Sequence, residues 1–232
     1  MPKDRLKDVI YGRIVVDYWT QKEERHRRRL TVGGNFSCYS GDSSTPTSDI
    51  TTAKLIINST ISTPGVMYMC CDIKCFYLEI ILSRYEYIKI KIDIQTEEII
   101  LEYNLVNLSH NGYEYYDICK GMHGLPKEGI LSNQQLVRKL ETKGYSPCKQ
   151  TLGLWRHKWR PIAFSLVVEN FGVKYVEEKH VKHLINTTQE NYQVSMEWEG
   201  KPYCGIIIKW NHQKHVFDLF MPGYTQATLH KF

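Results

Sequence analysis

The sequence contains no apolar run that approaches the roughly 18 residues of a membrane-spanning helix, and its first residues, MPKDRLKD, are polar. We therefore expect neither a signal peptide nor a membrane anchor, and no membrane partner. Seven cysteines are an odd number in a chain of 232 residues. This number argues against a small disulfide scaffold and for reduced thiols, so an intracellular, cytoplasmic location is expected.

Three frequent site patterns are missing as well. The spacing of Cys70, Cys71 and Cys75 matches no zinc-binding pattern, and buried thiols account for it better. No Lys-Ser/Thr pair follows Gly33-Gly34, which excludes a glycine-rich phosphate loop there. His180 and His183 lie one helical turn apart without an evident third ligand, as on a solvated helix face.

The composition is that of a folded chain with a modest positive charge. Hydrophobic residues make up 42% of it and aromatic residues 12%, enough for a core in either one or two domains. The formal net charge of +5 permits a polyanionic partner without requiring one. Sixteen tyrosines interspersed with basic residues suit base stacking, but they suit ordinary packing between strands too.

The hydrophobic patterning mixes helices with antiparallel hairpins and predicts an α+β fold. Helices are predicted over residues 51–61 with Asp49 as N-cap, over 127–143 with Gly144 as C-cap, over 178–192, and from Pro222 onward. Strands are predicted in IVV (14–16), in the basic segment 25–32, at 66–71, in IKIKIDI, GLWRHKW, PIAFSLVV, VKYV, YCGIIIKW and VFDLFM. IKCFYLEIIL stays ambiguous, residues 35–49 suit a loop, and the abrupt end of the last helix suggests a piece of a longer chain.

Two acids follow apolar strands. Asp72 ends the strand at 66–71, and Glu169 lies at the tip of the hairpin that follows residues 161–168, in the segment Glu169–Gly172. Strand ends are rigid, and a hard cation such as Mg²⁺ needs oxygen ligands held rigidly. The two acids meet if their strands are neighbours in one sheet. Hairpin tips are also acidic for ordinary turn reasons, so position alone leaves both interpretations open.

The sequence segments around these acids help to decide between a metal site and an ordinary acidic turn. They are MCCDIKCFYLEIILSRYEYIKI (69–90), KGMHGLPKEGILSNQQL (120–136) and FSLVVENFGVKYV (164–176), flanked by RHRRRLTVGGN (25–35), YCGIIIKW (203–210) and MPGYTQATLHKF (221–232). In this order they resemble motifs of copia-type retroelement reverse transcriptases. The first three resemble the first catalytic motif, the K-x-L-Y-G-L-K-Q-A-P block and the Y-V-D-D strand. The resemblance extends from about residue 10 to the end.

The resemblance implies a single polymerase domain with fingers and an antiparallel palm sheet backed by the helices at 127–143 and 178–192. Residues 1–64 would be mainly fingers, 65–195 palm with finger segments, and 196–232 a closing hairpin and the start of the next helix. Such enzymes extend a primer on an RNA or DNA template from deoxynucleoside triphosphates, using Mg²⁺. Carried over by position, the catalytic residues would be Asp72, Glu169 and Asn170, the metal ligands Asp72 and Glu169, and the nucleotide-binding residues Tyr77, Lys127, Arg27, Arg28 and Arg29.

Two motifs depart from the family. Glu169 and Asn170 stand where the family has two aspartates, so one carboxylate is longer and the other is an amide. Misplacement on the order of 1 Å costs about a hundredfold in a preorganised site. Lys127 replaces a glutamine that positions nucleotide and template, and Glu128 follows it. We therefore expect little or no polymerase activity. The alternatives are a nucleic-acid-binding remnant of the same fold and a relic without a partner.

Overall fold

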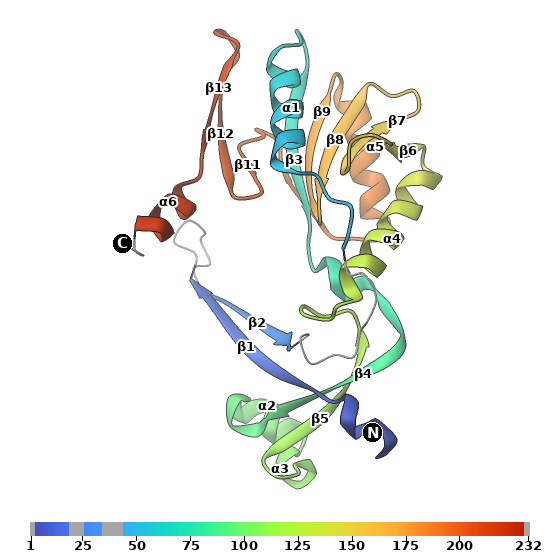
Figure 1. Ribbon diagram of the computed structural model, residues 1–232, viewed down its shortest axis with the longest axis vertical. Coiled ribbons are helices and arrows are strands. Elements are labelled where there is room, and N and C mark those ends of the chain that lie inside the picture. The colour runs from blue at the N-terminus through green and yellow to red at the C-terminus, as the bar shows by residue number, and fades with distance from the viewer. Residues whose placement is uncertain (1–2, 19–25, 34–43, 230–232) are drawn as a thin grey trace. The chain divides into compact units, whose positions relative to one another are not determined.

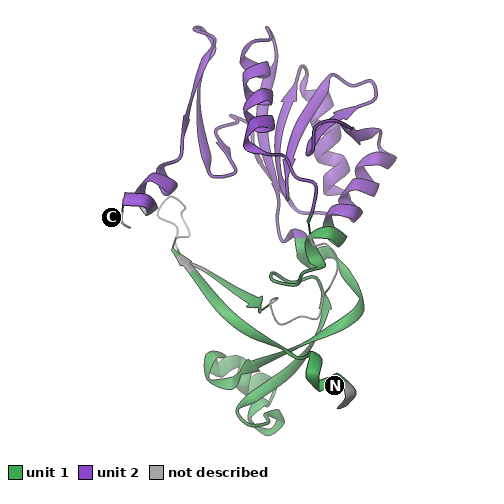
Figure 2. Cartoon of the chain, viewed as in Figure 1, with its two compact units in different colours: residues 1–44, 77–132 green, residues 45–76, 133–232 purple. Residues whose placement is uncertain are grey.

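The structure is a computed structural model that describes residues 3–18, 26–33 and 44–229. Contacts divide the chain into two compact units (Figure 2). Unit 1 comprises residues 1–44 and 77–132, and unit 2 comprises residues 45–76 and 133–232. Each unit is therefore assembled from two separate stretches of the chain.

Unit 1 is built on a four-stranded sheet in the order β2-β1-β4-β5, in which β1 and β4 pair in parallel and the other neighbours are antiparallel. Its core contains Ile10, Ile88, Ile90 and Ile118. In chain order its elements are η1 (Lys3–Asp8), β1 (Ile10–Tyr18), β2 (His26–Val32), β4 (Ile81–Lys91), η4 (Ile92–Ile94), α2 (Glu97–Glu102), α3 (Leu105–Leu108) and β5 (Tyr113–Lys120).

Unit 2 is built on a six-stranded antiparallel sheet in the order β10-β3-β9-β8-β7-β6, with a three-stranded sheet β11-β12-β13 beside it. Its elements are α1 (Ile50–Ile61), β3 (Met67–Ile73), β6 (Tyr145–Pro147), β7 (Leu154–His157), β8 (Ile162–Val167), β9 (Asn170–Tyr175), α5 (Glu178–Gln189), β10 (Val194–Glu197), β11 (Pro202–Tyr203), β12 (Ile206–Asn211), β13 (Val216–Phe220) and α6 (Pro222–Leu229). Two further helices, η3 (Phe76–Glu79) and α4 (Glu128–Thr142), cross a boundary between the units along the chain.

The central strands of the six-stranded sheet are apolar on both faces, because each face is covered. α1 packs against β3, β8 and β9, whereas α5 packs against β9 and β10 on the opposite face (Figure 1). Side chains alternate between the faces of a strand, so Tyr68 and Cys70 join the α1 side, while Met69, Phe171 and Val173 are fully buried on the other. This two-sided burial explains the nearly continuous apolar runs in the sequence.

Most predicted helices are confirmed. Asp49 Oδ1 accepts a hydrogen bond from Thr52 N at 2.7 Å and caps α1 as expected. α4 and α5 lie within the predicted 127–143 and 178–192, and α6 begins at Pro222. Tyr192 is buried although α5 ends before it. The helix at 50–61 belongs to unit 2, so the expected boundary at residue 64 does not coincide with the division by contacts.

The hairpins β8/β9 and β12/β13 are confirmed, with corrections at their ends. The strands predicted at 14–16 and 25–32 pair with each other as the antiparallel hairpin β1/β2. Residues 170–172 are paired within β9, so the turn is Val168-Glu169 and not the segment 169–172. IKIKIDI leaves the sheet after Lys91 and ends in η4, and IKCFYLEIIL is a turn, η3 and the start of β4. Of the predicted loop, residues 44–49 are described and carry neither helix nor strand, and the rest lies outside the described residues.

Two predictions about isolated side chains need correction. His180 is 5% exposed, and His183 Nδ1 lies 2.9 Å from Tyr145 Oη, so these histidines pack inward instead of forming a solvated face. Cys70 and Cys71 are buried as predicted, but Cys75 is exposed in the turn after β3.

Within the described residues, no helix combines the length and the apolar character that crossing a membrane requires.

Candidate functional site

The two acidic segments singled out in the sequence meet in the six-stranded sheet of unit 2. Asp72 in β3 pairs with Asn170 in β9, and Ile73 N donates a hydrogen bond to Glu169 O at 3.0 Å. Asn170 also pairs with Val167 of β8, which closes the two-residue turn that carries Glu169. Segments nearly 100 residues apart in the chain are thus held together by adjacent strands, which is the arrangement that a site at the strand ends requires.

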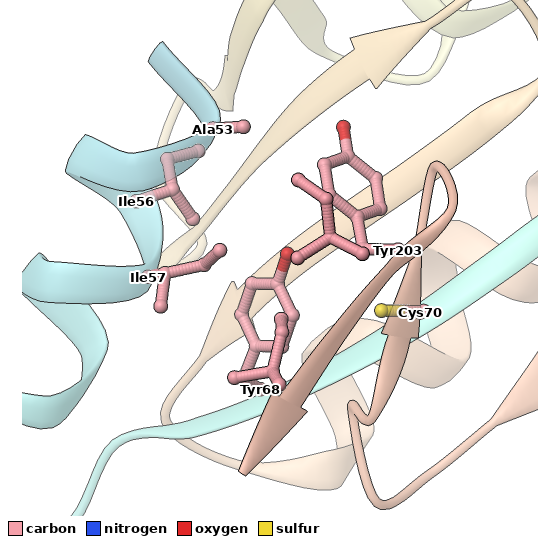
Figure 3. Close-up of a cluster of buried hydrophobic side chains, with 8 residues drawn as sticks. Ala53, Ile56, Ile57, Tyr68, Cys70 and Tyr203 are labelled. Atoms are coloured by element: carbon pink, nitrogen blue, oxygen red, sulfur yellow. The ribbon is translucent and has the colours of Figure 1, made fainter. Parts of the chain in front are cut away.

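The side chains of Asp72 and Asn170 share one face of the sheet, because they are a directly paired couple. Tyr68 and Cys70 lie on the same face by the alternation along β3. Figure 3 shows Tyr68, Cys70 and Tyr203 together with the helix α1 residues that cover this face. The hydroxyl of Tyr203 lies 2.9 Å from Ser165 Oγ and donates to Ser165 O at 3.2 Å, which fastens β11 to β8.

Cys204 is a residue of this region that sequence reasoning missed. It occupies the turn between β11 and β12 with Gly205, and both residues have positive φ, 50° and 79°. The turn residue is exposed, yet burial of its thiol raises the pKa of Cys204 to about 11, and the carboxylates of Glu169 and Asp72 contribute to the rise. The thiol therefore lies within the electrostatic field of both acids. The only sequence signal was its place beside Tyr203.

The turn that carries Glu169 is strained. Val168 has a φ of 54°, in the left-handed region that a β-branched residue rarely adopts. Backbone conformations of this kind cost on the order of 1–3 kcal/mol and persist where the surrounding structure enforces them. Pairing on both sides, Val167 with Asn170 and Asn170 with Asp72, supplies that enforcement.

The donor set at these strand ends fits one hard cation. Asp72 and Glu169 supply two carboxylates, and Asn170 supplies an amide oxygen without a charge. Mg²⁺ in proteins is commonly held by one or two carboxylates with water completing its shell. Among the described residues, no three His, Cys, Asp or Glu side chains gather closely enough to hold a metal ion.

The residues predicted to bind nucleotide all belong to unit 1. The ring of Tyr77 contacts His123 edge-on, with 5.0 Å between ring centres. Lys127 is exposed at the start of α4. The backbones of residues 27–29 pair with β1, where Arg28 is exposed and Arg29 half-buried, and the side chain of Arg27 lies outside the described residues. Because the acids belong to unit 2, a joint site of these residues with Asp72 stays a prediction.

Comparison with known proteins identifies no family. No protein-family model matches the chain, and no curated protein matches it. Among solved structures, it is similar to an apo telomerase from Candida tropicalis truncated from its C-terminal domain, with a TM-score of 0.41 and 11% sequence identity. The match covers 90% of this chain and 54% of that one. The chain thus has a weak structural likeness to telomerase over about half of the telomerase chain, and this likeness does not establish a shared fold.

Proposed function

We propose that this chain is the RNA-directed DNA polymerase domain of a copia-type reverse transcriptase in which nucleotidyl transfer is strongly impaired. The observation that carries the proposal is the pairing of Asp72 with Asn170, beside the turn that bears Glu169. This pairing joins the segment that resembles the first catalytic motif to the segment that resembles Y-V-D-D. Such a juxtaposition is what that resemblance requires.

The two units suit a polymerase architecture. In the proposal, the six-stranded sheet of unit 2 with α4 and α5 is the palm, and the four-stranded sheet of unit 1 belongs to the fingers. A primer–template and a deoxynucleoside triphosphate are the partners, and Tyr77, Lys127, Arg27 and Arg29 contact the nucleotide or template. The support is the antiparallel sheet with its acidic strand ends and the basic strand β2.

The chemistry assigned to unit 2 is the positioning of one cation. Asp72 at the end of β3 and Glu169 in the adjoining turn would hold Mg²⁺, and Asn170 would orient its amide toward the same place. When bound, Mg²⁺ supplies neutralisation of charge on a phosphoryl group. The rigid strand ends fix both carboxylates before substrate arrives, so little reorganisation is needed.

The impairment follows from charge. Two unit charges 4 Å apart attract by roughly 4 kcal/mol at an effective dielectric constant near 20. Replacing a carboxylate with the amide of Asn170 removes an attraction of at least this order from a divalent ion. The longer side chain of Glu169 moves the remaining carboxylate outward, which further disturbs the geometry.

Primer extension on an RNA template tests the proposal, first with Mg²⁺ and then with Mn²⁺. We expect little or no extension by the unchanged chain and measurable extension by the double variant Glu169→Asp, Asn170→Asp. Adding Asp72→Asn to that double variant should abolish the extension again. Adding Asp117→Asn, a change at an exposed acid of β5, should leave it unchanged. Strong extension by the unchanged chain that Asp72→Asn removes would show that the impairment is wrong.

A second candidate function is nucleic-acid binding without catalysis. The uncharged Asn170 favours it, together with Lys127 and Glu128 in place of the family's residues. It predicts that a labelled primer–template binds with an affinity that falls steeply as salt rises, while the double variant still shows no extension. Absence of salt-dependent binding in every variant would exclude both functions.

A further inference from the structure

Unit 1 contains a cavity of about 190 Å³, and Lys127 is the one residue of its lining to which the polymerase proposal gives a role. Part of its wall is aliphatic and is formed by Ile10, Leu82, Leu125 and Leu131, which also belong to or pack on the core of this unit, and the rest of the wall is mainly polar and charged. All of its lining residues come from unit 1. An apolar cavity of about 150 Å³ holds a benzene molecule, so this one has room for a small ring with a short substituent.

One buried acid lines this cavity without a partner. Glu128, the first residue of α4, is only 3% exposed, and its Oε1 makes no hydrogen bond to any described residue. The fit around it is close, since a β-carbon on Gly121 would lie 2.9 Å from this oxygen. Burial raises the pKa of Glu128 to about 8. A buried carboxyl that lacks a donor is energetically unfavourable unless a ligand supplies one.

The other charged residues that line the cavity are paired with opposite charges or exposed. Asp8, at the end of η1, accepts from Arg5 Nε at 2.6 Å and from Arg84 Nη2 at 3.1 Å. Glu86 of β4 lies 3.5 Å from Arg5 Nη2. Lys127 also lines the cavity but is exposed. No cation opposes the burial that shifts the pKa of Glu128, which distinguishes this acid from its neighbours.

We propose that this cavity binds a small primary amine with an apolar body, its ammonium group paired with the carboxylate of Glu128. The aliphatic part of the wall receives the body, and the ammonium supplies the positive charge that the buried carboxylate of Glu128 lacks. A plain hydrocarbon leaves the carboxyl unpaired, and an anion cannot pair with the carboxylate of Glu128. The argument rests on Glu128 and the aliphatic side chains, to which the polymerase proposal gives no role, so the amine site stands or falls separately from the proposed function.

Benzylamine is the probe. It is titrated into the full chain, and binding is followed by NMR of the protein's isoleucine and leucine methyl groups. We expect saturable shifts at Ile10 and Leu131, with benzyl alcohol at least about tenfold weaker and benzoate without effect. Calorimetry at pH 7 in two buffers of different ionisation enthalpy should show nearly one proton released per amine bound, because the free carboxyl is largely protonated there.

Three variants make the test specific. Glu128→Gln should weaken benzylamine binding at least about tenfold and remove the proton release. Glu97→Gln, at an exposed acid of α2, should change neither. Leu131→Trp fills the cavity and should abolish binding even if Glu128→Gln folds poorly. Equal binding by Glu128→Gln, equal binding of benzyl alcohol or benzoate, or no methyl shifts with benzylamine would each overturn the proposal.

Discussion

Gly172 lies in β9 opposite Cys70 of β3, and the hydroxyl of Tyr68 occupies the space beside it. A β-carbon at this position would lie 2.2 Å from Tyr68 Oη and 2.9 Å from Ser165 Oγ. Tyr68 is packed against residues of α1 and β12 in the core cluster. The glycine of the segment VENFG is therefore required by packing, two residues after Asn170.

Gly172→Ala should lower the free energy of unfolding by about 1–3 kcal/mol, the usual effect of overpacking a core. Urea denaturation followed by tryptophan fluorescence reports on this region, because four of the five tryptophans lie in unit 2. Gly223→Ala is the matched control, since nothing lies within 4 Å of a β-carbon there and α6 favours alanine. Equal stability of the two variants would show that the Tyr68 side chain moves aside without a measurable loss of stability.

At the same scale, the candidate acids were visible in the sequence, whereas their surroundings were not. Asp72 and Glu169 each follow an apolar strand, a local pattern that can be read directly. The pairing of Asp72 with Asn170 depends on the order β3-β9, which no local pattern encodes. Cys204 escaped notice for the same reason, because a separate hairpin brings it to this face. Glu128 stood out only as a departure from a motif, and its burial could not be predicted.

Among the elements, the β8/β9 hairpin turns in two residues and places Val168 in a left-handed conformation. Asparagine tolerates that conformation far better than valine. Val168→Asn should therefore raise the free energy of unfolding by about 1 kcal/mol. Thermal denaturation of the full chain measures the change. Val176→Asn, at an exposed position just after β9, serves as control and should give no gain. A loss of stability in Val168→Asn would mean that the valine side chain contributes packing that outweighs the strain.

Long helices were easier to predict than short elements, for a physical reason, and the short helices α2 and α3 were missed. Val181, Leu184 and Ile185 repeat with the helical period and are all buried, so α5 could be identified from a short window. β6 and β10 contain three and four residues, too few for a period to show. β5 was missed because it mixes acids with tyrosines, and Glu114 is one of its buried residues. The positions of these three strands in their sheets depend on pairing with other strands and not on a local pattern.

On the scale of the whole molecule, the two units should respond to pH in opposite directions. In unit 2, His157 Nε2 donates to Lys143 O at 3.0 Å, and its Nδ1 accepts from Trp159 N and Arg160 N, both at 3.2 Å. These bonds require the neutral ring, and burial lowers the pKa of His157. Its contribution to stability is complete above the unfolded pKa near 6.5 and is lost as pH falls through the lower folded value.

Unit 1 has the reverse dependence through Glu128. Burial raises the pKa of its carboxyl from 4.5 to about 8, so its contribution is complete below pH 4.5 and is lost as pH rises to about 8. Hydrogen exchange of the amides in β4 and β5 should therefore quicken from pH 5 to pH 8 after correction for intrinsic rates, and that of β8 and β9 should slow. Glu128→Gln should flatten the pH dependence of exchange in β4 and β5, and His157→Gln should flatten that in β8 and β9. His212→Gln, at an exposed site, is the control and should alter neither. Parallel trends in both sheets would contradict this assignment.

The division of the chain also sets an order for its folding during synthesis. All four strands of unit 1 have been made once residue 120 has left the ribosome. α1 and β3 are made earlier than β4 and β5, yet their partner β9 ends only at Tyr175. The apolar segment 67–73 therefore stays without its neighbouring strands while about 100 further residues are translated. During this time unit 1, whose two stretches flank this segment in the sequence, can already fold. This interval is where the nascent chain is most exposed to mispairing or capture by a chaperone.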